Sequence, residues 1–152
     1  MSKKKTSLAI NKRATHDYLI IEKIEAGVVL EGCEVKSFRT SHVTLKESYA
    51  KVFDNELWLF NCYVAPYPQA SGNIPEPYRN RKLLLHSKEI KRLISKIETK
   101  GYILVPYRAY LSKGRVKIEL ILGQPKKLHD KRHAIKEREI KREIDRSTKN
   151  RY

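Results

Sequence analysis

Two histidines, His129 and His133, lie four residues apart, and this spacing can bring two metal ligands onto one face of a helix. The residues around them argue against a metal, because Lys131 and Arg132 separate the histidines and two further lysines precede them. This positive charge would repel a divalent cation. We therefore expect no metal site and interpret both histidines as surface or RNA-contacting residues.

The two cysteines, Cys33 and Cys62, are the other candidates for chemistry. No histidine pattern is present to activate either thiol, and their sequence neighbours are apolar, so we expect them to pack in the core. They form neither a disulfide framework nor a metal pattern, which favours a reducing, cytoplasmic location. No glycine-rich phosphate loop, paired metal-binding carboxylates or Gly-x-Ser-x-Gly turn appears. The sequence therefore predicts a protein that is not an enzyme and needs no cofactor.

Positive charge is the chemistry that this sequence supplies in quantity. Its 33 Lys and Arg residues against 17 Asp and Glu give a formal net charge of +16. This balance predicts a polyanionic partner, which could be RNA, DNA or an anionic membrane surface. We do not expect a membrane partner, because no apolar run is long enough to cross a bilayer. The N-terminal lysines precede only the short apolar run Leu8–Ile10, so a signal peptide is not expected either.

The charge is concentrated at the two ends of the chain. Residues 1–13 contain five basic groups and no acid, and residues 124–152 contain eleven Lys or Arg against five Asp or Glu. The 110 residues between them carry only +5. This distribution predicts a basic N-terminal arm at residues 1–10, a folded domain at 11–123 and a basic tail at 124–152.

Aromatic residues accompany two of the basic segments. Asn11–Tyr18 and Tyr78–Lys82 both mix cations with aromatic rings, and tyrosine is the commonest aromatic residue of the chain. A tyrosine ring can stack on a base while its hydroxyl bonds a phosphate, although we assign more than half of the nine tyrosines to packing. With the tail, these segments give three basic regions that a folded domain could bring near one another.

Short strands dominate the pattern of the middle segment. A short helix is expected after Gly32, and Gly27 is expected to form a bend or bulge between two strands. Asp54–Asn55 is a turn signal. The expected strands are Tyr18–Ile21, Val28–Leu30, the alternating Ser48–Phe53, and Leu57–Val64, which looks buried on both faces.

A proline-rich loop, Pro66–Pro77, separates these strands from the clearest helix, Ser87–Lys100. Ser87 is its expected N-cap and Gly101 its stop. The runs Tyr102–Leu111 and Val116–Leu122 predict a hairpin that turns near Lys113–Gly114. Many short strands without a strand–helix–strand rhythm predict a mainly β fold with flanking helices, a small antiparallel barrel of the oligonucleotide-binding type.

The tail has no continuous apolar stripe, and Lys136–Arg146 is almost wholly charged. A segment that is polar nearly all round is unfolded alone or held by a partner. We expect disorder in the free protein and helix on binding.

An ordered set of motifs resembles one known family, the transfer-messenger RNA-binding small protein B family. The resemblance runs from about Asn11 to the C-terminus, and the ordered set is far more specific than any one motif. Its motifs are Asn11–Ala14 with His16 and Tyr18, Glu25–Gly27, Gly32 and Glu34–Ser37 with Arg39, Arg81–His86, Asp130–Arg132 and Ile135–Glu139.

This resemblance implies a protein that binds the transfer-RNA-like part of transfer-messenger RNA and enters stalled ribosomes with it and elongation factor Tu. The tail would then lie in the empty messenger channel. We expect a monomer.

Site residues follow from the same motifs. The resemblance implies that one set faces transfer-messenger RNA: Asn11, Arg13, His16, Tyr18, Glu25, Gly27, Glu34, Lys36 and Arg39. Glu25 and Glu34 could orient cations or accept bonds from base or ribose donors, and a plain salt bridge is at least as plausible for Glu34. A second set would act at the decoding centre and along the channel: Lys126, Lys127, His129, Asp130, Lys131, Arg132, Lys136, Arg138, Lys141 and Arg142.

Two departures from the family pattern bear on structure. The family often has glycine where this chain has Ser41, so the turn there could differ. Gln124–Lys127 replaces a Gly-Lys-Lys run, and its proline could change the angle at which the tail leaves. Composition alone would favour a basic structural protein of the ribosome, and an RNA-processing enzyme is the third alternative.

Overall fold

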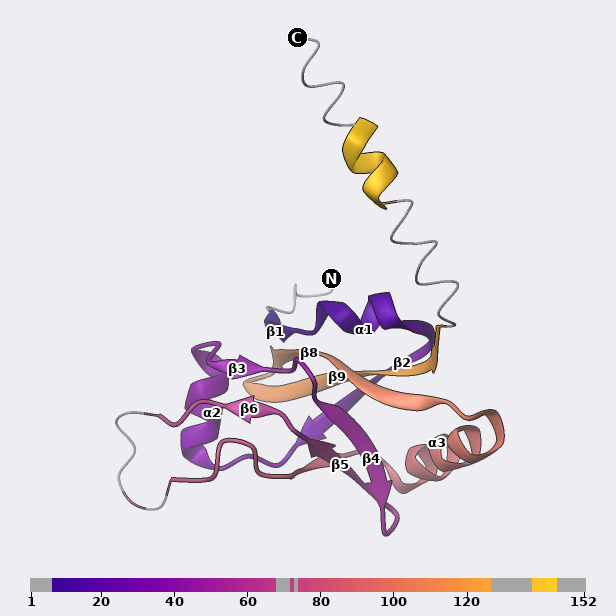
Figure 1. Cartoon of the computed structure of the whole chain (residues 1–152). Coiled ribbons are helices and arrows are strands. Elements are labelled where there is room, and N and C mark those ends of the chain that lie inside the picture. The colour runs from indigo at the N-terminus through magenta and orange to yellow at the C-terminus, as the bar shows by residue number, and fades with distance from the viewer. Residues whose placement is uncertain (1–6, 68–71, 73, 127–137, 145–152) are drawn as a thin grey trace.

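The computed structural model describes residues 7–67, 72, 74–126 and 138–144, and it confirms the predicted class, a mainly β antiparallel fold with flanking helices (Figure 1). The elements in chain order are β1 Ser7–Ile10, α1 Lys12–Asp17, β2 Tyr18–Val28, α2 Gly32–Arg39, β3 Val43–Thr44, β4 Tyr49–Phe53, β5 Glu56–Phe60, β6 Tyr63–Val64, β7 Arg81–Leu84, α3 Ser87–Lys100, β8 Ile103–Ser112 and β9 Arg115–Pro125.

The strands close into a barrel. Their order is β1-β8-β4-β5-β7-β2-β9, and an additional pairing of β8 with β9 joins the two ends, with β1 attached beside β8. Closure removes the exposed strand edges that would otherwise invite aggregation. A separate two-stranded ladder pairs β3 with β6.

The barrel interior is filled by aliphatic side chains. Leu57 and Leu59 of β5 and Ile118 and Leu120 of β9 are fully buried. Phe38 of α2 joins this core, as does Leu93 of α3, and the two helices lie at opposite sides of the barrel (Figure 1). Burial of an aliphatic or aromatic side chain contributes about 1.5–3 kcal/mol, so Phe38 and Leu93 help to hold the two helices against the barrel.

The helix at Ser87–Lys100 and the hairpin that follows are confirmed. Gly101 ends α3 in the left-handed conformation at φ 66°, and its amide donates to the Ile97 carbonyl. The N-cap position is His86 rather than the predicted Ser87. The β8–β9 hairpin turns at Lys113 and Gly114, both at positive φ, as a two-residue turn between twisted strands requires.

The prediction of two strands separated by a bend at Gly27 is wrong. β2 is one strand of eleven residues, and its pairing with β9 runs from Tyr18 to Gly27. The irregularity lies between Ile20 and Glu22 instead. The polar residues in the middle of β2 lie on the exterior of the barrel, so they do not interrupt the strand.

The prediction of one strand at Leu57–Val64 buried on both faces is also wrong. β5 ends at Phe60, and Asn61 at φ 58° breaks the run before β6. Along β5 only Leu57 and Leu59 are buried, and Trp58 between them is half-buried. A barrel strand has one interior face and one exterior face, so alternation is the physical expectation.

The structure also alters the ends of the folded domain. Ser7–Ile10, placed in the N-terminal arm by the sequence analysis, pairs with β8 as β1. Lys12–Asp17 is helical, and this helix was not predicted from the sequence. β9 continues through Pro125, two residues into the segment assigned to the tail. Residues 138–144 are helical with exposed side chains, and their residue types are good helix formers; the order of the tail in the free protein stays a prediction.

Candidate nucleic-acid interface

The short helix α1 lies on the outside of the barrel, above β8 and β9 (Figure 1). Ala14 is its buried residue, and it packs with Val105 and Ile121 in a small apolar cluster outside the main core. Lys12 and Arg13 are exposed. The helix is therefore anchored by one small side chain and presents its cations to solvent.

Asn11, which precedes α1, serves the anchoring rather than the exposed surface. Its side chain is buried and donates from Nδ2 to the Pro106 carbonyl at 3.1 Å. Its backbone amide donates to the Tyr107 carbonyl at 2.6 Å. Both bonds are directed at β8, so this geometry gives Asn11 an anchoring role, and its contact with RNA stays a prediction.

Below α1, the exterior of β2, β8 and β9 carries charged residues that contact one another. Arg108 Nε donates to Glu119 at 3.0 Å, and Lys23 lies 3.9 Å from the same carboxylate. Glu25 is the cross-strand partner of Glu119 in the β2–β9 ladder. Two acids opposite each other would repel, and cations beside Glu119 offset that repulsion.

Tyr110 connects Glu25 to this network. Its hydroxyl donates to the Glu25 carboxylate, and the Arg108 guanidinium lies 4.9 Å from the centre of its ring. Burial, together with the adjacent Glu25 carboxylate, raises the pKa of Tyr110 well above its usual range. The phenol therefore remains protonated and acts as a donor at neutral pH.

At the far end of β2, Gly27 lies beside two residues that the sequence analysis missed. A Cβ on Gly27 would stand 3.3 Å from Leu84 Cβ and 3.7 Å from Lys117 Nζ. Leu84 is half exposed although the preceding residue in β7, Leu83, is buried. Only the strand pairing brings Leu84 and Lys117 next to Gly27, so no local sequence signal could have identified them together.

The α2 residues of the predicted set do not share one role. Lys36 and Arg39 are exposed, and Lys36 Nζ lies 5.3 Å from the centre of the Tyr67 ring. Glu34 is buried and forms ion pairs with Arg79 and Arg81. Of the roles considered for Glu34, the structure therefore shows the salt bridge. Its buried carboxylate is directed at the two arginines and not at the surface.

Arg81 explains why Glu34 points inward. Its side chain is fully buried, with Nε 2.7 Å from Glu34 and Nη1 2.9 Å from the Cys62 carbonyl. Burial alone would raise the pKa of Glu34, but hydrogen bonds from Arg79, from the Glu31 amide and from Arg81 outweigh it and lower that pKa. The carboxylate thus stays ionised and ties α2 to the segment before β7.

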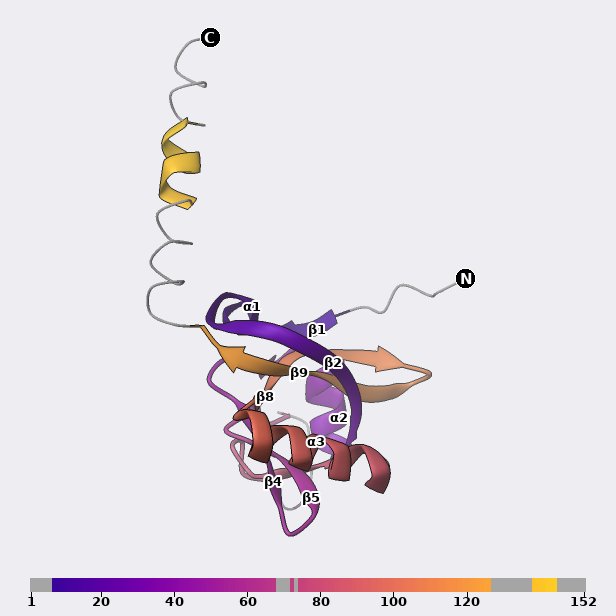
Figure 2. The ribbon, with the colours of Figure 1, turned by 90° about the vertical axis from the view of Figure 1, so that its right-hand side faces the viewer.

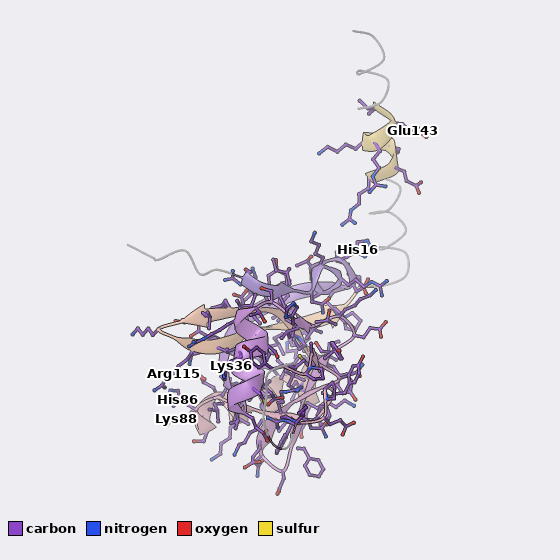
Figure 3. All side chains as sticks on the ribbon, turned by 90° about the vertical axis from the view of Figure 1, so that its left-hand side faces the viewer. His16, Lys36, His86, Lys88, Arg115 and Glu143 are labelled. Atoms are coloured by element: carbon purple, nitrogen blue, oxygen red, sulfur yellow. The ribbon has the colours of Figure 1, made fainter. Side chains whose placement is uncertain are left out.

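The structure brings only part of the predicted RNA-facing set together. Figure 3 shows His16 on α1 well away from Lys36 on α2. His16 Nδ1 lies 3.1 Å from Asp17. Half-buried Tyr18 begins β2, whose exterior then carries Glu25. We define the basic face as the exterior of α1, β2, β8 and β9 that carries Lys12, Arg13, Lys23, Arg108 and Lys117.

The tail residues of the predicted site fall mostly outside the described residues. Those outside are Lys127, His129, Asp130, Lys131, Arg132 and Lys136. Lys126 lies beside α1, with its amide 3.0 Å from the Asp17 carbonyl. Arg138, Lys141 and Arg142 are exposed on the helical segment 138–144. The tail therefore leaves the barrel next to the basic face.

Other chemistry finds little support among the residues that the structure describes. No three His, Cys, Asp or Glu side chains among them are grouped to hold a metal ion. Cys62 packs in the core as predicted, and burial raises the pKa of its thiol to about 12. The same prediction is wrong for Cys33, which is only half-buried on α2. No helix within the described ranges is long and apolar enough to span a bilayer.

Comparison with known proteins decides the family. A sequence model described as SmpB protein matches residues 8–150. This chain belongs to the SmpB protein family. An SsrA-binding protein of Sulfurihydrogenibium sp. is 49% identical over 142 residues, covering 93% of both chains. The SsrA-binding protein of Syntrophobacter fumaroxidans is 54% identical and covers 93% of this chain and 88% of its own.

A solved SmpB structure agrees with the fold described above. It comes from work described as "tmRNA-SmpB: a journey to the center of the bacterial ribosome" and is 44% identical to this chain. The TM-score is 0.65, and the match covers 83% of this chain and 87% of the solved one. The predicted family and its oligonucleotide-binding type of barrel are both confirmed.

Proposed function

We propose that this chain binds the transfer-RNA-like domain of transfer-messenger RNA through its basic face and delivers it to stalled ribosomes. The observation that carries the proposal is the clustering of five cations on the exterior of α1, β2, β8 and β9 in a member of the SmpB family. Its relatives include SsrA-binding proteins, which supports this partner. The chain carries out no catalysis in this role.

The cations of the basic face supply affinity without reading sequence. Lysine and arginine bind phosphates and release counterions, which makes affinity depend steeply on salt. The acid at Glu25, held by Tyr110, can accept hydrogen bonds only from donors such as an exocyclic amine or a ribose hydroxyl. Gly27 carries no side chain beside Leu84 and Lys117, and in this proposal a ribose or base contacts the barrel at these two side chains.

The tail would act at a second place, the ribosome. It begins at Lys126 beside α1, so RNA bound to the basic face and the start of the tail lie next to each other. In this proposal the tail occupies the empty messenger channel, where ribosomal RNA phosphates attract its charge. Elongation factor Tu would accompany the complex, and the protein would act as a monomer.

The test is an RNA-binding assay with matched charge reversals. Arg13→Glu and Lys117→Glu should each weaken binding of the isolated transfer-RNA-like domain by about tenfold, because each replaces a phosphate contact with repulsion. Lys100→Glu at the end of α3 makes the same change away from the basic face and should have little effect. The log–log salt slope should be roughly −0.7 to −0.9 per neutralised phosphate, and a slope near zero would refute the proposal.

The alternative, a basic structural protein of the ribosome, makes a different prediction. Such a protein would sediment with a ribosomal subunit in cells that lack transfer-messenger RNA. Co-sedimentation that survives that deletion, together with unchanged binding by Arg13→Glu, would favour the alternative.

A further inference from the structure

The exterior of β4, β5 and β7 forms a second distinct surface. Tyr49, Lys51 and Phe53 alternate along β4 with residues that point into the barrel, and all three are exposed. On β5 the exterior residues are Trp58 and Phe60, because Leu57 and Leu59 fill the core. Figures 1 and 2 both place the β4–β5 hairpin on the side of the barrel away from α1.

The strand register assembles these aromatic residues into one patch. Tyr49 pairs with Phe60, and their rings stack with centroids 5.3 Å apart and planes 13° from parallel. Lys51 pairs with Trp58, which in turn pairs with Lys82 of β7. We call this surface the aromatic face and define it by Tyr49, Lys51, Phe53, Trp58, Phe60 and Lys82.

None of these rings belongs to the main core. Phe53 is 71% exposed and Tyr49 is 42% exposed, while the main core is complete with aliphatic residues of the same strands. A contiguous exposed group of large aromatic side chains carries a risk of aggregation. Such a surface is explained if a ligand covers it.

Cations interleave with the rings, and this favours a nucleic acid over a protein as the ligand. Lys51 Nζ lies 5.3 Å from the centre of the Tyr49 ring. Lys82 Nζ contacts Glu56 at 2.9 Å at the edge of the same surface. Rings at which bases can stack, alternating with ammonium groups that attract phosphates, are the arrangement used for single-stranded nucleic acid. A protein interface would instead be depleted of lysine.

The position of the aromatic face in the barrel supports the same ligand. In chain order β4 and β5 are the second and third strands of the closed barrel, after β2. Barrels of the oligonucleotide-binding type use the face of their second and third strands for oligonucleotides. Tyr49 and Phe53 lie four residues apart on β4, about 13 Å along the strand, which leaves room for more than one nucleotide.

A hollow of about 720 Å³ adjoins this surface. It lies between β4 and α3, and Tyr49 and Lys51 belong both to its lining and to the aromatic face. Ile94, Ile97 and Tyr102 supply an apolar wall. A base that is turned away from β4 could therefore pack against this apolar wall.

We propose that the aromatic face is a second RNA site, which takes unpaired nucleotides. Their bases stack on Tyr49 and Phe53, and their phosphates lie near Lys51 and Lys82. The site does not depend on the basic face, so its failure and the failure of the proposed function can be told apart.

Trp58 makes the proposal directly testable, because it is the only tryptophan in the chain and lies within the aromatic face. An oligouridylate of about six nucleotides, within the usual site size of such barrels, should quench its fluorescence in a saturable way. The double variant Tyr49→Ala/Phe53→Ala should weaken this binding by about tenfold or more, the effect expected for loss of base stacking. Because both side chains are exposed, the substitutions should leave the fold intact, and thermal melting of each variant checks this.

Two controls fix the location of the binding. Tyr78→Ala removes an equally exposed ring from another segment and should leave the quenching unchanged. Arg13→Glu, on the basic face, should change binding of the transfer-RNA-like domain but not of the oligouridylate.

If the melting temperature of the double variant is lowered, Phe53→Ala alone serves as a milder variant. Quenching that is absent at high oligouridylate concentration, or unaltered in a folded Phe53→Ala variant, would overturn the proposal. The proposal would also be overturned if oligonucleotides did not change the fluorescence of Trp58 while a ribosomal protein crosslinked to the aromatic face. That result would assign the surface to protein contact.

Discussion

At the scale of single residues, Tyr110 shows how a barrel strand can prepare an acid for recognition. Its hydroxyl donates to Glu25 while Arg108 covers its ring, so the carboxylate is held by a group that is itself packed. Tyr110 is almost completely buried and lies in β8, whereas Glu25 is exposed on β2. Tyr110 is therefore a positioning residue for the proposed RNA interface.

Removing only that hydroxyl tests this role. Tyr110→Phe should weaken binding of the transfer-RNA-like domain by about fivefold, equivalent to one modest hydrogen bond of about 1 kcal/mol. In filter binding, Tyr110→Phe combined with Glu25→Gln should lose no more than Glu25→Gln alone, because both changes remove one interaction. Additive losses would mean that Tyr110 acts only through stability. Tyr107→Phe is the matched control on the same strand.

Glu34 belongs to the stability of the fold. Glu34→Gln leaves the fully buried Arg81 without its counter-charge and should lower the free energy of unfolding by about 3–5 kcal/mol. Since folding lowers the pKa of Glu34, its stabilisation is present above the usual pKa and is lost as pH falls toward the lowered value. Urea titrations at several pH values should therefore show that the difference in free energy of unfolding between the unmodified protein and Glu34→Gln becomes smaller in acid.

The exposed Glu98→Gln is the control for that comparison and should change stability by less than about 0.5 kcal/mol. An equal loss in both variants would contradict the role given to Glu34. The partners of Glu34 lie 45 and 47 positions away, at Arg79 and Arg81. Sequence could suggest a salt bridge for this acid, but only the tertiary fold identifies its arginines.

At the scale of elements, the end of α2 explains the departure at Ser41. The Ser41 amide donates to the Phe38 carbonyl and the His42 amide to the Ser37 carbonyl, both at 3.0 Å. These two bonds form a Schellman motif, in which the residue after the cap takes the left-handed conformation. Ser41 does so at φ 59°, where a side chain is unfavourable. The turn is thus kept despite the loss of the glycine typical of the family.

Ser41→Gly should accordingly stabilise the protein. Relief of the left-handed strain should contribute more free energy than glycine costs by adding entropy to the unfolded chain. We therefore expect the free energy of unfolding to rise by about 0.5–1 kcal/mol, seen as a melting temperature a few degrees higher. The same change at the exposed Ser95, inside α3, should instead cost about 0.5–1 kcal/mol. A lower melting temperature for Ser41→Gly would show that the strain is not relieved.

Elements with a strong local signal were predictable. α3 has its apolar repeat and Gly101, and the β8–β9 hairpin has Lys113–Gly114. The continuous β2 was not predictable, because its polar middle becomes strand only by pairing with β9. β1 was missed for a similar reason, since four residues beside a run of lysines become a strand only against β8.

At the scale of the whole molecule, closure of the barrel separates two exterior surfaces. The basic face lies on α1, β2, β8 and β9, and the aromatic face lies on β4, β5 and β7. The sequence predicted a basic RNA-binding barrel, and its motifs included Arg13 and Glu25 of the candidate site. It could not group Lys23, Arg108 and Lys117, since residues on three strands meet only in the closed sheet.

The tail provides the last test, because the domain ends beside α1 at Lys126 and not at Gly123 as first expected. Residues 127–152 carry ten Lys or Arg against five acids and no continuous apolar face, so a chain ending at Lys126 should fold and melt nearly as the full chain does. It should still shift the transfer-RNA-like domain in a gel, somewhat more weakly for the loss of +5 in charge.

Tagging of nascent chains on stalled ribosomes should nevertheless disappear, because nothing would occupy the messenger channel. Lys131→Glu/Arg132→Glu in the full chain should reproduce much of that loss while retaining the gel shift. If tagging survives truncation, or if truncation abolishes RNA binding, then the basic face and the tail do not divide the work in this way.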